Sequence, residues 1–179
     1  MKWVALLVAF LFVASIVPGC LEVETKFSVG GGDEQWWVNY KDAREEHAGG
    51  TVIHPQWVLD ALQSKPVVFV IHKNSCYTCK PQADRMNEIA EDINKYTEKI
   101  AFFDLVLDGD SAEYNQAQSA FIYDPNGGDS YIALTGIITK VKDASGNVAI
   151  GWHAWEGNTG EEEMIDWVED AIAHYSDNG

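Results

Sequence analysis

The stretch that organises this sequence covers residues 66–81 and reads PVVFVIHKNSCYTCKP. Its first part, Val67–Ile71, is a run of β-branched and aromatic residues, which predicts a buried strand. A short polar turn follows, and the paired cysteines Cys76 and Cys79 then open a segment with helical apolar spacing. The apolar residues of that segment are Met86, Ile89, Ala90, Ile93 and Tyr96. This spacing predicts an amphipathic helix directly behind the cysteines.

Two cysteines three positions apart at the start of a helix can close a small disulfide. The unpaired N–H groups at a helix start favour negative charge on a nearby thiol, which lowers the pKa of that thiol. Thiol-disulfide exchange needs such a thiolate to attack and a second thiol close enough to resolve the mixed disulfide. The CxxC pair therefore predicts redox chemistry.

The order of strand, CxxC and helix resembles the thioredoxin-like family, and the resemblance covers residues 52–175. It implies an α/β fold, a thioredoxin-like sandwich in which a central mixed sheet carries helices on both faces. It also implies that Cys76 attacks and Cys79 resolves. The implied activity is that of a thiol-disulfide oxidoreductase acting on protein thiols or disulfides, without a cofactor.

Two departures from the family concern the motif and its proton chemistry. Ser75 precedes the motif and Tyr77-Thr78 lie inside it, where classical thioredoxins have Trp before the first cysteine and Gly-Pro between the two. Val70 occupies the place, six residues before Cys76, where the family often has a buried aspartate. Proton transfer to and from Cys79 is therefore expected to use water or another group.

A third departure concerns the strand that faces the cysteines. Thioredoxin-like proteins usually open this strand with a cis-proline, whereas residues 134–137 here contain no proline. By position, the resemblance places Thr135 and then Gly136 there, and a trans peptide is expected. These two residues and Tyr77 are predicted to contact the substrate.

The charge balance excludes two classes of partner. The chain has 179 residues, with 28 acidic residues against 12 basic ones and a net charge of −16. Such a charge disfavours nucleic acid and anionic membrane surfaces. The acidic residues are spread along the chain, which indicates a solvated acidic surface.

The N-terminus has the pattern of an export signal. A lysine and an apolar run precede Pro18-Gly19-Cys20, an ending that resembles a prokaryotic lipobox. We expect residues 1–19 to be a signal peptide, Cys20 to carry lipid and residues 20–35 to be a flexible tether. The domain, residues 36–179, would then lie outside the cytoplasm, anchored to the outer face of the membrane. The alternatives are an uncleaved anchor helix, or a signal cut nearby that leaves Cys20 free.

The cysteine count agrees with lipid attachment. The chain has three cysteines, and lipid on Cys20 leaves only the CxxC pair.

The remaining elements follow from local patterns. A strand is expected at 36–40, a helix after Pro55, a strand at 100–107 and a hairpin joining 131–141 to 148–155. Asp110 with Glu113, and Thr159 with Glu162, are predicted to cap a short helix and the final helix.

Two other uses of the CxxC remain open. Cys76 and Cys79, with His72, could carry a soft ion such as Cu(I), although a structural histidine is the commoner case. A structural zinc site needs more ligands than one cysteine pair supplies. The domain could also be a binding module with a structural disulfide. The cluster at residues 152–155, which includes His153, is expected to serve packing.

Overall fold

We describe a computed structural model that places residues 25–38, 52–92, 94–127 and 132–179. Residues 1–19 and Cys20 lie outside these ranges, so the signal peptide and the lipid attachment stay predictions. Within the described ranges, no helix combines the length and the apolar character needed to cross a membrane.

A six-stranded mixed sheet forms the centre of the molecule, in the order β1-β2-β6-β5-β3-β4. The strands are β1 (Ser28–Gly30), β2 (Gln35–Trp37), β3 (Val67–His72), β4 (Ala101–Val106), β5 (Leu134–Lys142) and β6 (Val148–Glu156). The helices are α1 (Gln56–Ala61), α2 (Lys80–Ala90), α3 (Tyr114–Ala120) and α4 (Glu161–Asn178), with a 3-10 turn η1 (Phe121–Tyr123).

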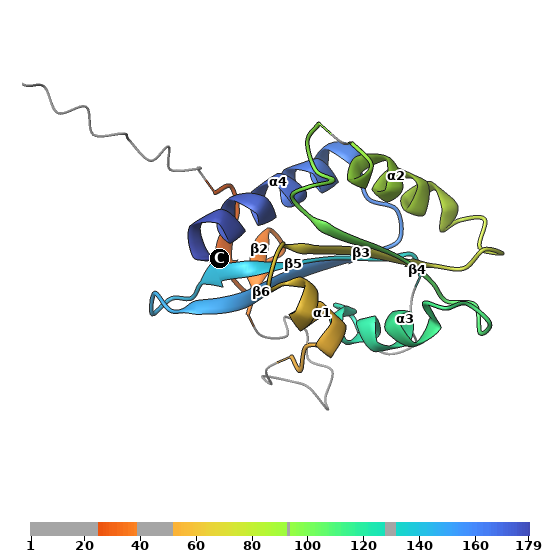
Figure 1. The fold of residues 1–179 in the computed structure, drawn as a ribbon, viewed down its shortest axis with the longest axis horizontal. Coiled ribbons are helices and arrows are strands. Elements are labelled where there is room, and N and C mark those ends of the chain that lie inside the picture. The colour runs from red at the N-terminus through yellow and green to blue at the C-terminus, as the bar shows by residue number, and fades with distance from the viewer. Residues whose placement is uncertain (1–24, 39–51, 93, 128–131) are drawn as a thin grey trace, which may run out of the picture.

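Helices cover both faces of this sheet, with α2 and α4 on one face and α1 and α3 on the other (Figure 1). Strand β3 is parallel to β4 and antiparallel to β5, and β5 is antiparallel to β6. The predicted α/β class, with a mixed sheet between two helical layers, is confirmed.

Strand β3 is apolar throughout because both of its faces are buried. Val68 and Val70 pack in the core under α2 and α4, whereas Val67, Phe69 and Ile71 pack in the core under α1 and α3. All five side chains have no exposed surface. The apolar run therefore reflects a central strand, as predicted.

The predicted hairpin is present as β5 and β6, paired from Leu134 with Glu156 to Lys142 with Val148. At its turn, the Asp143 carboxylate accepts the N–H groups of Ser145 and Asn147. Gly146 has a φ of 81°, which a residue with a side chain rarely adopts.

Both predicted helix caps are wrong. Helix α4 follows Gly160, which lies one residue after the predicted cap and has no side chain to cap the helix. The Thr159 N–H donates to the Gln82 side chain at 2.9 Å, where a capping box would use Glu162. Helix α3 follows Glu113, and again no side chain caps it. Three glutamates lie in the first turn of α4, where the positive end of the helix dipole stabilises their negative charge.

Helix α2 is shorter than predicted, since it ends at Ala90 rather than near Tyr96. The reason is a local turn in which the Asp92 carboxylate accepts the Asn94 N–H at 3.0 Å. Tyr96 is nevertheless buried, and its hydroxyl donates to Glu169 of α4 at 2.7 Å.

The packed part of the chain begins before residue 36, inside the segment predicted to be a tether. The ring of Phe27 stacks on Trp167 with centroids 3.9 Å apart, and β1 pairs with β2 in parallel. Lys26 also bonds to Asp166 and Asp170 of α4, and the Phe27 carbonyl lies 3.1 Å from His174 Nε2. These contacts were not readable from a segment that is rich in glycine at 30–32.

Candidate active site

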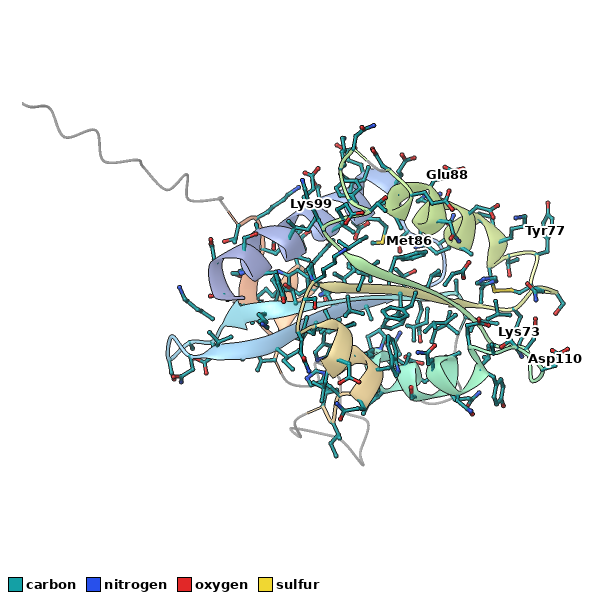
Figure 2. The ribbon with its side chains drawn as sticks, in the orientation of Figure 1. Lys73, Tyr77, Met86, Glu88, Lys99 and Asp110 are labelled. Carbon is teal, nitrogen blue, oxygen red and sulfur yellow. A yellow bond between two sulfur atoms is a disulfide. The ribbon has the colours of Figure 1, made fainter. Side chains whose placement is uncertain are left out.

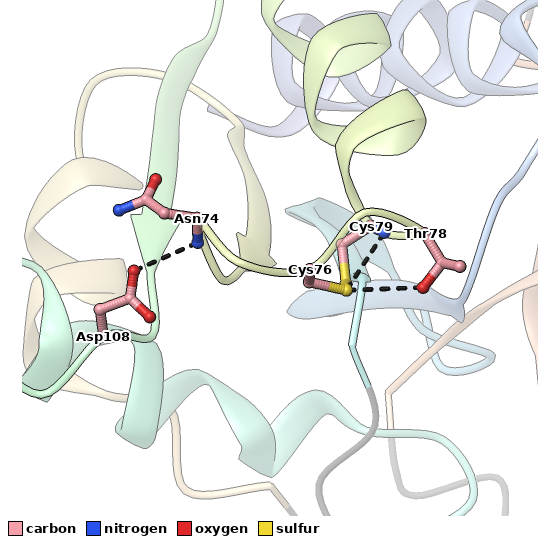
Figure 3. Close-up of a disulfide and its surroundings, with 5 residues drawn as sticks. All are labelled: Asn74, Cys76, Thr78, Cys79 and Asp108. Carbon is pink, nitrogen blue, oxygen red and sulfur yellow. Dashed lines mark hydrogen bonds between the residues drawn. A yellow bond between two sulfur atoms is a disulfide. The ribbon is translucent and has the colours of Figure 1, made fainter.

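The two cysteines form a disulfide in the connection between β3 and α2, where their Cα atoms are 5.3 Å apart (Figure 3). This connection leaves the carboxyl edge of the parallel pair β3 and β4. Ligands of open α/β sheets commonly bind outside that edge. The site therefore lies at the position that the topology favours.

The two sulfurs have different surroundings. Cys76 is partly exposed, whereas Cys79 has 1% of its surface exposed and belongs to the core under α2 and α4. The Cys79 N–H lies 3.2 Å from the Cys76 sulfur, and the Thr78 hydroxyl lies 3.5 Å from it. Cys79 is the residue at which α2 starts, with Pro81 in the first turn, as expected for a helix that begins near Cys79.

Backbone contacts hold the loop before the disulfide. The Cys76 N–H donates to the carbonyl of Lys73 at 3.0 Å, which closes a turn. The Asn74 N–H donates to the Asp108 carboxylate at 3.1 Å, from the segment that follows β4 (Figure 3). The loop is thus tied to the neighbouring strand as well as to its own helix.

The three residues predicted to contact substrate lie in different environments. Tyr77 is 91% exposed at the end of the molecule that carries the disulfide (Figure 2). Thr135 is fully buried, and a Cβ on Gly136 would come within 2.4 Å of the Phe69 ring. The substrate contacts of all three stay predictions, and Tyr77 alone presents a large exposed side chain.

The backbone before β5 departs from the expected geometry in one place. Ile132 and Ala133 are joined by a cis peptide bond, although neither residue is proline. The peptides that precede Thr135 and Gly136 are not cis, in agreement with the expectation at these two positions.

His72, at the end of β3, belongs to a polar cluster beside the CxxC loop. Its Nε2 lies 2.7 Å from Oδ1 of Asp104 on β4, and the Asn87 amide of α2 donates to Oδ2 at 2.9 Å. These three side chains line a cavity of about 230 Å³, together with Lys80 and Ala83 of α2.

Charge pairing sets the ionisation of this cluster. The hydrogen bond to the Asp104 carboxylate raises the pKa of His72, although partial burial opposes the change. Burial acts to raise the pKa of Asp104, but the hydrogen bonds from His72 and Asn87 outweigh it and leave that pKa lowered. Both shifts favour the ion pair.

A second polar network fixes α2 on the other side. Gln82 is fully buried, and its amide donates to the Thr135 hydroxyl at 2.9 Å. The Gln82 carbonyl accepts from Arg85 and from the Thr159 N–H, both at 2.9 Å. Arg85 also donates to Asn158, so the network joins α2, β5 and the loop before α4.

Both networks bond to one row of residues that are paired across three neighbouring strands. Thr135 of β5 pairs with Val70 of β3, and Val70 pairs with Asp104 of β4. Gln82 and Asn87 each bond to a polar member of that row, one on either side of Val70. Two amide side chains therefore fix the position of α2, and of Cys79 at its start.

Sequence reasoning missed Asp104 and Gln82. A signal existed for Asp104, which is the only charged residue in the otherwise apolar segment 101–107. Gln82 gave no such signal, because a polar residue in a helix is usually solvated. Val70 occupies the place where the family resemblance led one to look for an aspartate, and its partner on the adjacent strand β4 is the aspartate Asp104.

The other histidine singled out from the sequence serves packing. His153 is 3% exposed, and its ring stacks on Trp167 with centroids 4.2 Å apart. In the part of the chain that the structure describes, no three His, Cys, Asp or Glu side chains are grouped to hold a metal ion.

Comparisons with known proteins add no family to this picture. No protein-family model matches the chain, and no curated protein matches it closely enough to count as a relative.

Proposed function

We propose that the protein is a thiol-disulfide oxidoreductase of the thioredoxin-like type, which exchanges with protein cysteines outside the cytoplasm. The observation that carries the proposal is the disulfide itself. Cys76 is partly exposed, whereas Cys79 is buried at the N-cap position of α2. That asymmetry suits an attacking thiol and a resolving thiol.

The order of elements from α1 to α4 supports the thioredoxin-like assignment. A helix, a central strand, the CxxC helix, a parallel strand, a further helix, an antiparallel hairpin and a final helix follow one another. The family has this arrangement, with its cysteine pair between the strand and the helix. Export and lipid attachment at Cys20 rest on the leader sequence alone.

The exchange runs in two balanced steps. The Cys76 thiolate attacks one sulfur of a partner disulfide, which forms a mixed disulfide and releases one partner thiolate. Cys79, once deprotonated, attacks the Cys76 sulfur, forms the bond seen here and releases the second partner thiolate. The partner disulfide gains two electrons and the protein dithiol loses two. The reverse sequence oxidises a partner dithiol.

The buried Cys79 must lose a proton before it can resolve. We assign the Asp104 carboxylate, which is ionised beside His72, to accept this proton through water, because it lines the cavity against the first turns of α2. Lys80 and Ala83, which also line the cavity, follow Cys79 within four residues. This assignment fills the role that Val70 cannot perform.

The test compares single cysteine variants of the full chain with a model protein disulfide as partner. Cys76→Ser should abolish exchange, whereas Cys79→Ser should accumulate mixed disulfides that persist on a non-reducing gel. Cys20→Ser is the matched control, since it also replaces one cysteine with serine but should leave exchange unchanged. It should also release the protein from the membrane fraction, if lipid holds it there.

Four outcomes would contradict the proposal or the roles assigned within it. Retained exchange in Cys76→Ser, or faster alkylation of Cys79 than of Cys76, would reverse the assigned roles. Tight copper binding by the reduced protein without any exchange would favour a metal-handling protein. Absence of both activities would favour a binding module with a structural disulfide.

A further inference from the structure

We infer that the disulfide acts on partner cysteines flanked by basic residues, in preference to partner cysteines in acidic segments. This inference rests on the proposed function and names the partner class of the same site. It follows from how charge is distributed between the two edges of the sheet.

The edge that carries the disulfide is acidic. Strand β4 ends at Val106, and the segment that follows it carries Asp108, Asp110 and Glu113. Asp108 contacts the CxxC loop directly through the Asn74 N–H, at 3.1 Å. Asp110 is exposed and lies at the same end of the molecule as Tyr77 (Figure 2).

The cations at this edge do not offset those carboxylates. Lys80 is paired with Asp84 at 2.6 Å, and His72 is paired with Asp104 at 2.7 Å. Lys73 is exposed, and the described residues give it no ion-pair partner. Arg85, at the same edge, donates to Asn158 and to the Thr159 carbonyl, and no described carboxylate forms an ion pair with it. Two cations, Lys73 and Arg85, therefore stand against the three carboxylates of the segment after β4.

The opposite edge of the sheet holds most of the described lysines. The register puts the starts of β3 and β4 beside the end of β5. The lysines that precede or occupy these strand ends are Lys65, Lys95, Lys99, Lys140 and Lys142. Acidic residues such as Glu98, which lies 3.9 Å from Lys65, accompany them. Charge is thus polarised along the strands, with the negative end at the disulfide.

This polarity acts on the encounter and on the chemical step in the same direction. A net charge of −16 attracts a cationic segment at long range, and the local gradient directs it to the disulfide edge. Exchange also passes negative charge between sulfurs, which nearby ammonium or guanidinium groups stabilise. An acidic partner meets repulsion at both stages. Tyr77, 91% exposed beside Cys76, offers a ring face on which such cations can lie.

The test uses three peptide disulfides of equal length, each a symmetric dimer, in which the cysteine is flanked by two lysines, two glycines or two glutamates. Each rate with the reduced full-length protein is divided by the rate of the same peptide with a small neutral dithiol, which removes differences in intrinsic reactivity. At an ionic strength of about 0.01 M, where the Debye length is about 30 Å, the lysine peptide should exceed the glutamate peptide about tenfold. At about 1 M salt the ratio should approach one.

Charge variants locate the effect. Asp110→Asn and Asp108→Asn should each lower the low-salt ratio, and the new amide at 108 can still accept the Asn74 N–H. Lys73→Gln should raise the ratio. Glu98→Gln is the matched control, because Glu98 precedes the start of β4 and should leave the ratio unchanged.

The outcomes separate this inference from the proposed function. Exchange with the glycine peptide, together with a ratio near one or below one at low salt, would overturn the partner class alone. A ratio of lysine-peptide to glutamate-peptide rates that does not change with salt would do the same. So would a ratio that Glu98→Gln changes as much as Asp110→Asn does. Absence of exchange with all three peptides would overturn the proposed function itself.

Discussion

The two faces of the central sheet are both buried, but different interactions hold them. The face under α1 and α3 is an aromatic core, where Phe69 packs with Tyr123 and Trp57 at centroid distances of 5.7 and 6.3 Å. The face under α2 and α4 combines apolar packing with the hydrogen-bonded row at Thr135 and Asp104.

The difference indicates which face of the sheet must hold a helix in one fixed orientation. Apolar packing is non-directional, so an aromatic core stabilises the sheet without fixing one helix to within tenths of an ångström. Hydrogen bonds between buried groups are directional and costly to leave unmade. The face that must place Cys79 therefore carries hydrogen bonds from α2 to the strands, whereas the hydrogen bond between His54 and Tyr123 on the opposite face does not reach a strand.

The largest expected effect is on the aromatic face. Phe69→Ala removes a fully buried ring and should lower the free energy of unfolding by about 4 kcal/mol. Urea denaturation of the oxidised protein would measure this. Ile53→Ala, at a side chain that is 83% exposed, is the matched control and should change stability by less than about 0.5 kcal/mol. Folded Phe69→Ala should still exchange at close to the normal rate, so a large loss of activity would contradict the division of roles.

Gln82→Leu tests the opposite face. It leaves the Thr135 hydroxyl and the Thr159 N–H without their partner and should cost about 2 kcal/mol. Because α2 loses one of its two fixed points, exchange per folded molecule should also fall about tenfold. Stopped-flow kinetics with a neutral disulfide would show this. An unchanged rate would mean that Asn87 alone positions the helix.

His54, on the aromatic face, should make the protein sensitive to acid. Burial lowers the pKa of His54 to about 4, and its Nδ1 lies 2.8 Å from the Tyr123 hydroxyl. The unfolded chain binds a proton near pH 6.5 that the folded protein does not, so stability should fall as pH drops from about 6.5 to about 4. With a discount for partial exposure, the loss is about 2 kcal/mol. His54→Asn keeps an acceptor for Tyr123 and should remove this part of the pH dependence in urea titrations.

His72, on the redox face, should show the smallest effect and the opposite sign. Its pKa is raised by Asp104, so its contribution to stability is complete below about pH 6.5 and is lost as pH rises through the folded-state pKa. His72→Gln should therefore be destabilised by about 1 kcal/mol near pH 6 and by almost nothing near pH 9. A difference that grows with pH would contradict the ion pair.

Much of the architecture could be predicted from the sequence. The run at 67–71 indicated a strand buried on both faces, and the cysteine spacing indicated the start of a helix near Cys79. The hairpin was also readable, because apolar strands flank a turn rich in Asp, Ser, Gly and Asn. These features depend on residues close together in the chain, where period and turn chemistry suffice.

The helix termini were less predictable, because their hydrogen-bond partners lie far away in the chain. Thr159 has the local pattern of a cap, but its N–H donates to Gln82, which is 77 residues away in sequence. A tertiary partner thus replaced the local one. The packing of residues before 36 was also not predicted, since the Phe27 ring stacks on Trp167 of α4, which lies far away in sequence.

By itself the sequence determined the elements, the central strand and the two cysteines that could pair. Only the tertiary structure decided that Asp104 stands opposite Val70, that Gln82 reaches Thr135 and that the lysines gather at the edge away from the disulfide. Strand register and helix placement set these relations, and both result from packing across the whole sheet. Residues far apart in the chain become neighbours only when that packing is complete, so no local pattern encodes them.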